Sequence, residues 1–108
     1  MTMAKYMIQG SYTPEGVKGL TKAGGTSRRA FVGEMIKKAG GSMESFYFAF
    51  GDSDVYVICD LPDTTSATAL SLAVNSTGAV SLKTVLLISP EEMDAATKKE
   101  IGYKPPGA

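Results

Sequence analysis

Histidine and tryptophan are absent from the 108 residues, and cysteine occurs once, at Cys59. Without histidine the chain cannot form Ser-His-Asp or Cys-His catalytic groups, and it lacks a common zinc ligand. The acidic residues show no spacing typical of paired-carboxylate catalysis. We therefore expect no metal and no cofactor, and any enzymatic chemistry would have to use Asp, Tyr, Arg or Lys side chains.

A single cysteine also excludes a disulfide within the chain, which suits a reducing compartment. Cys59 ends the apolar run Val55–Cys59. We expect a buried thiol that fills space rather than a nucleophile, because no histidine is present to activate it.

The chain has neither a net charge nor a long apolar segment. Eleven Lys and Arg residues balance eleven Asp and Glu residues, so no overall field attracts nucleic acid or an anionic membrane. No apolar stretch approaches the ~18 residues that span a bilayer, and the start shows no signal-peptide pattern. We expect a cytoplasmic protein that binds neither nucleic acid nor membrane.

What the chain does contain is typical of an ordinary globular domain, with 44% hydrophobic and 20% charged residues. Its length fits one domain, which we place over residues 1–108. The segment from Tyr103 to Ala108 is predicted to be an extended tail, because Pro105 and Pro106 cannot continue a helix.

Hydrophobic periodicity predicts four strands separated by helices. The predicted strands cover residues 4–12, 43–50, 54–61 and 79–88. The predicted helices run from 14 to a break at the glycine pair 24–25, from the pair to 39, from 63 to 75 and from 91 to about 101.

Helix starts are marked by residues that cap free backbone N–H groups. Thr13 before Pro14 and Asp63 after Pro62 predict two of them, and Thr26 or Ser27 is expected to cap the helix after the glycine pair. Ser89-Pro90-Glu91-Glu92 reads as a capping box. The inner face of the second helical segment is predicted to carry Phe31, Val32, Met35, Ile36 and Ala39.

This β-α-β-β-α-β order predicts an α+β, ferredoxin-like fold, with a four-stranded antiparallel sheet and an additional C-terminal helix. Both long helices would cover one sheet face and leave the other bare. Alternation makes both faces substantially apolar: Phe46, Phe48 and Phe50 share one side of their strand, and Tyr47 and Ala49 the other. A bare apolar face is unusual on a monomer, so we expect a homodimer or a higher symmetric oligomer.

Three groups of residues are candidates for a ligand site. The first is Gly25, Thr26, Ser27, Arg28 and Arg29, after Gly24 at a helix start, where backbone N–H groups and guanidinium groups favour a small anion. The alternative is a loop that only breaks the helix, with two solvated arginines.

The second candidate is Gly51-Asp52-Ser53-Asp54, where two carboxylates could hold a cation, although hairpin-turn chemistry explains the same residues. The third group would place hydroxyls and carboxyls in a pocket between sheet and helices, and packing roles explain its members equally well. Its members are Tyr6, Tyr12, Tyr47, Tyr56, Asp60 and Gln9.

Several segments resemble the GYD domain family of small bacterial proteins. They are AKYMIQGSYT at residues 4–13, ESFYFAFG at 44–51, DVYVI at 54–58, TVLL at 84–87 and PEE at 90–92. The resemblance implies a fold related to the dimeric α/β barrels and no established activity. The name points to a Gly-Tyr-Asp signature, whereas this chain has Gly51-Asp52-Ser53-Asp54, so only Gly51 and Asp54 carry over.

Three functions are consistent with these patterns. The leading hypothesis is a homo-oligomer that binds a small ligand between sheet and helices, with Arg28 and Arg29 favouring an anion. The second is a cofactor-independent oxygenase or isomerase of the dimeric α/β-barrel type, using Tyr and Asp groups in the same pocket. The third is a structural or regulatory module whose tail docks on a partner.

Overall fold

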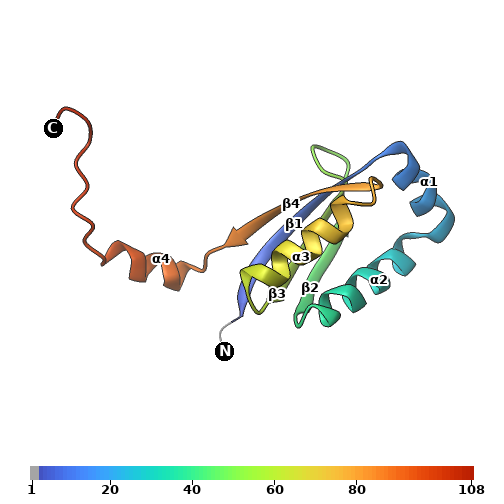
Figure 1. The fold of residues 1–108 in the computed structure, drawn as a ribbon, viewed down its shortest axis with the longest axis horizontal. Helices are drawn as coiled ribbons and strands as arrows, with labels where there is room; N and C mark the ends of the chain where they lie inside the picture. Colours follow the sequence, from blue (N-terminus) through green and yellow to red (C-terminus); the bar gives the residue numbers. More distant parts are fainter. Residues whose placement is uncertain (1–2) are drawn as a thin grey trace.

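Four strands form one antiparallel sheet in the order β2-β3-β1-β4 (Figure 1). The computed structural model describes residues 3–108. Its strands are β1 (Ala4–Tyr12), β2 (Ser42–Phe48), β3 (Val55–Leu61) and β4 (Val80–Leu87). Its helices are α1 (Pro14–Ala23), α2 (Gly25–Lys38), α3 (Thr64–Asn75) and α4 (Pro90–Thr97).

Helices α2 and α3 lie on the same face of the sheet, with α2 over β2 and α3 beside β4 (Figure 1). With the central strands β1 and β3 antiparallel and both crossovers on one side, the chain has the predicted ferredoxin-like α+β fold. The other face of the sheet is left without a helix.

The helical segment after β1 is broken at Gly24, as the glycine pair predicts. Gly24 has φ 87°, a conformation that favours glycine, and its N–H donates to the carbonyl of Leu20 at 2.8 Å. The same residue is the N-cap of α2, which has no side-chain cap. The prediction that Thr26 or Ser27 caps α2 is therefore wrong, because the helix already begins at Gly25.

The core lies between the sheet and α2 and α3. It is built from alternate residues of β1 and β3, which face the helices, and from the inner sides of α2 and α3. Its buried members are Tyr6, Ile8, Ile36, Val55, Val57, Cys59, Leu61, Ala67 and Leu70. One predicted core residue is not in it: Phe31 on α2 is 58% exposed, whereas Ile36 on the same helix is buried, because α2 packs against β2 and not closely against α3.

The β2–β3 hairpin is shorter than predicted at its turn end. β2 ends at Phe48, and Phe50 lies in the turn, where its side chain is fully exposed. The connection is closed by the N–H of Ala49, which donates to the carbonyl of Asp54 at 2.8 Å. The pairing also shifts between Met43 and Ser45, so the edge strand β2 is bulged at Glu44.

The C-terminal segment extends away from the body of the molecule (Figure 1). Helix α4 has the predicted capping box at Ser89 and Glu92 but ends at Thr97, not near Ile101. Every residue from 90 to 108 is exposed. The radius of gyration is 17.0 Å, against about 13 Å for a compact chain of this length. No helix within residues 3–108 is long and apolar enough to cross a membrane.

Candidate functional site

The open face of the sheet carries an apolar strip that crosses all four strands. The register places Met7 between Ile58 of β3 and Val85 of β4, and sets Tyr47 opposite Tyr56. Tyr47 is 71% exposed and Val85 is also exposed, while the other three are partly exposed. This face therefore presents aliphatic and aromatic side chains to solvent without a covering helix.

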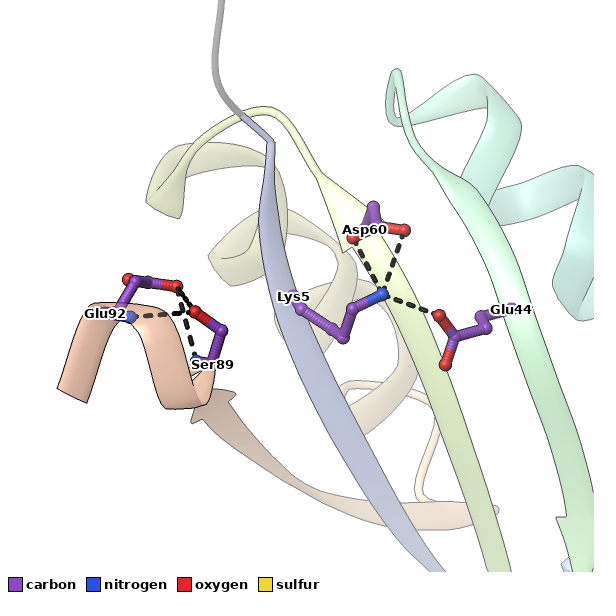
Figure 2. Close-up of polar contacts among 5 residues, drawn as sticks. All are labelled: Lys5, Glu44, Asp60, Ser89 and Glu92. Atoms are coloured by element: carbon purple, nitrogen blue, oxygen red, sulfur yellow. Dashed lines mark hydrogen bonds and ion pairs between the residues drawn. The ribbon is translucent and has the colours of Figure 1, made fainter. Parts of the chain in front are cut away.

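An ion-pair cluster lies at one end of the open face. The Lys5 Nζ lies 2.7 Å from Glu44 Oε1 and 3.2 Å from Asp60 Oδ1, and Figure 2 shows its amine pointing between the two carboxylates. Hydrogen bonds to Glu44 and then to Asp60 raise the pKa of Lys5. The cluster joins β1, β2 and β3 and keeps this end of the face polar.

The structure separates the predicted tyrosine and carboxylate set. Tyr6 is buried under the helices, but Tyr47, Tyr56 and Asp60 lie on the opposite, open face with Gln9. The period of two along a strand decides this, since residues at odd spacing point to opposite faces. These residues therefore do not form one pocket within a chain.

A surface groove lies between α2 and α3 at the end of the sheet where β4 begins. It has a volume of about 430 Å³. Its lining residues are Arg28, Phe31, Met35, Ala73, Val74, Thr77, Ala79 and Val80. The Arg28 guanidinium carbon is 5.3 Å from the centre of the Phe31 ring, a cation–π distance that holds the charge beside the apolar wall. We call this cavity the Arg28 groove.

Arg28 also lines a second cavity on the side of α1. This cavity, of about 240 Å³, includes Tyr12, Glu15 and Gly16 among its lining residues. Within residues 3–108 no carboxylate oxygen lies within 4.0 Å of the Arg28 guanidinium. Arg28 therefore lines both of these cavities, and its guanidinium has no ionic partner among residues 3–108.

The rest of the glycine-rich segment lies elsewhere. Gly25, Thr26 and Arg29 line a shallow cavity of about 250 Å³ with Phe46 and Phe48. Ser27 is exposed and lines neither this cavity nor the Arg28 groove. The predicted five-residue anion segment is thus divided between two sides of α2, because neighbouring helical residues point about 100° apart.

Asp54 serves the hairpin rather than a ligand in this structure. Its carboxylate accepts the N–H of Tyr12 at 2.8 Å, and its own N–H donates to the carbonyl of Gly10 at 2.8 Å. Asp52 is exposed in the turn. Among the described residues, no group of three or more Cys, Asp or Glu is arranged to hold a metal ion.

The sequence did not identify the aliphatic part of the Arg28 groove. Phe31 and Met35 share the helical period of Ile36, which predicts a core position for both, and no pattern in the sequence links them to Val74 and Thr77 on the other side of the groove. The Lys5–Glu44 pair was also missed. It depends on the register of both β1 and β2 against β3, which lies between them, and periodicity alone does not supply that register.

The fold and the open face define a small α+β domain of the ferredoxin-like class. The family model described as GYD domain matches residues 6–97, which is most of the chain. The chain therefore belongs to the GYD domain family, as its sequence resemblance implied. No curated protein and no solved structure matches it significantly.

Proposed function

We propose that this chain is a homodimeric binding domain that holds a small anion with an apolar body in the Arg28 groove. The observation that carries the proposal is the Arg28 guanidinium, which lies at an apolar groove with no carboxylate within 4.0 Å among residues 3–108. A guanidinium in this setting binds a carboxylate or sulfonate through charge-assisted hydrogen bonds. Phe31, Met35 and Val74 contact the apolar part of the ligand.

The groove size supports a small ligand rather than a macromolecule. Its volume of about 430 Å³ falls in the range of ~300–1,000 Å³ that holds small molecules. The lining is mostly aliphatic and aromatic, with Arg28 and Thr77 as its polar members. An anion with a compact apolar group satisfies both parts of this lining.

The open sheet face supports the dimer. Burying Met7, Ile58 and Val85 against a second copy removes apolar surface from water, which contributes about 25 cal/mol per Å². A two-fold related pair places the same strip on both sides of the interface. The polar Lys5–Glu44–Asp60 cluster then lies at the rim, where ion pairs stay hydrated.

Ligand binding is tested with anilinonaphthalene sulfonate, an apolar anion whose fluorescence rises when it binds. Arg28→Gln is expected to weaken binding at least about tenfold, because it removes a charge-assisted hydrogen bond. Arg29→Gln is the matched control, since Arg29 lines a different cavity. Equal affinity of the wild type and Arg28→Gln would contradict the proposed site. An equal loss of affinity in Arg28→Gln and Arg29→Gln would show that the anion binds by surface charge alone, which would also contradict it.

The dimer is tested by light scattering at micromolar concentration. Ile58→Asp is expected to yield monomers, because a carboxylate would be buried in the apolar strip. Leu72→Asp on the exposed side of α3 is expected to remain dimeric. A wild type with a monomer mass throughout would overturn the dimer.

A further inference from the structure

The C-terminal arm, which we define as residues 89–103, is a folded element without a surface to pack on. Ser89 Oγ accepts the N–H of Glu92 at 3.1 Å, and Glu92 Oε1 accepts the N–H of Ser89 at 3.4 Å, as Figure 2 shows. This capping box sets the start of α4 and its direction. A helix of eight residues is marginal alone in water, so its stability needs a tertiary contact.

The arm carries apolar side chains that the body leaves uncovered. Met93 on α4 is 53% exposed, and Ile101 and Tyr103 beyond it are 83% and 77% exposed. All three lie on a segment that Figure 1 shows extending away from the sheet. The arm therefore offers an apolar contact surface that no other segment within residues 3–108 covers.

The charge of the arm helix is matched by another surface of the same protein. Pro90–Thr97 contains three acidic residues and no basic one, and the two lysines of the arm, Lys98 and Lys99, follow after the end of the helix. The opposite balance occurs in α2, which has four basic residues and only Glu34 as an acid. Lys37 and Lys38 are exposed in its last turn, just before the edge strand β2. Helices α4 and α2 are thus complementary in charge.

The area of the open face gives a second argument for an additional contact. Four strands about 4.8 Å apart and about eight residues long cover a flat area of roughly 500 Å². A stable interface buries about 800 Å² of accessible surface on each partner. Polar side chains of the Lys5 cluster occupy one end of this face. The sheet faces alone are therefore a small interface for a dimer.

A dimer with its two-fold axis parallel to the strands would bring the C-terminal arm of one copy close to the basic last turn of α2 in the other. Because the sheet order is β2-β3-β1-β4, such an axis sets β4 of one copy opposite β2 of the other. The arm leaves the C-terminal end of β4, and the start of β2 at Ser42 follows the last turn of α2 closely in sequence. In such a dimer the arm of one copy would lie near Lys37 and Lys38 of the second copy.

We propose that the C-terminal arm of each copy binds the β2 edge of a second copy, with the acidic residues of α4 facing Lys37 and Lys38. Met93 and Ile101 pack against that edge and enlarge the buried area. The inference rests on the proposed dimer and adds the exchange of arms to it. The acids that face the lysines are Glu91 and Asp94, which leaves Glu92 to the capping box.

The test is a charge exchange in the full-length chain. Glu91→Lys with Asp94→Lys and, separately, Lys37→Glu with Lys38→Glu are each expected to weaken the dimer at least about tenfold, since attraction becomes repulsion at two sites. An equimolar mixture of the two variants should form heterodimers with an affinity within about threefold of the wild type. Sedimentation velocity measures the dissociation constants, and circular dichroism checks that each variant folds.

Lys18→Glu with Lys22→Glu on α1 is the matched control and should not change the dimer, because these lysines are exposed on another helix. A second variant, Met93→Asp, tests the apolar contact of the arm separately from the charges. It should weaken the dimer and leave the fold of the sheet and of helices α1 to α3 unchanged. Dimers of wild-type strength in both reversed variants would overturn the arm exchange and leave the sheet-face dimer standing. A monomeric wild type would overturn both.

Discussion

The N–H of Tyr12 donates to a carboxylate oxygen of Asp54 at 2.8 Å, which ties the end of β1 to the residue that opens β3. The bond satisfies a backbone donor where β1 gives way to α1. The main-chain groups of Asp54 also pair with Gly10 and Ala49. Asp54 therefore holds three segments of chain at the end of the sheet beside the Arg28 groove.

Replacing Asp54 with alanine is expected to lower the free energy of unfolding by about 1–2 kcal/mol, because it removes a hydrogen bond to a charged acceptor. Asp54→Asn keeps one acceptor oxygen and should lose less. Urea unfolding measures both. Asp52→Ala, exposed in the same turn, should stay close to the wild type, and an equal loss there would argue against the specific role of Asp54.

Two glycines of α1 should respond in opposite ways to alanine. A Cβ on Gly16 would collide with the carbonyl oxygen of Ala79 and lie 3.0 Å from the Tyr12 ring, so Gly16→Ala should destabilise by about 1–3 kcal/mol. A Cβ on Gly19 meets nothing within 4 Å. Gly19→Ala should therefore stabilise the helix by about 0.5–1 kcal/mol. Thermal unfolding gives the sign of each change.

The single thiol should be inert in the native protein. Burial raises the pKa of Cys59 from 9.0 to about 11, so the thiolate that reacts with iodoacetamide is scarce at neutral pH. We expect slow alkylation of the native chain and rapid alkylation in urea. Rapid alkylation of the native chain would mean that the sheet–helix core opens easily.

The same pKa predicts a loss of stability in alkali. A raised folded pKa favours the native state fully below pH 9, and this contribution is lost as pH rises from about 9 to 11, because the unfolded thiol ionises first. The wild type should lose on the order of 2 kcal/mol more than Cys59→Ala over this range. Parallel pH profiles of the two proteins would contradict the burial of the thiol.

Local signals predicted the elements because they depend on neighbours in sequence. Thr13 and Asp63 both accept the N–H three residues later, at Gly16 and Ser66, and Ser89 forms the expected capping box. Strand β1 has the predicted bounds, Ala4–Tyr12. The predicted ends of β3 at Leu61 and of α3 at Asn75 also agree, whereas errors of one to four residues occur at several other ends, where tertiary contacts decide how far a helix or strand continues.

The sequence by itself therefore determined the α+β class, the helix break at Gly24 and the alternation of side chains between the two faces of each strand. Capping and alternation are local properties. Tertiary structure decided which side of each element is covered. It left Phe31 at the Arg28 groove, moved Tyr47 and Tyr56 to the open face, and separated Arg28 from Arg29. Register and helix packing join residues far apart in sequence, and no local pattern records how those residues meet.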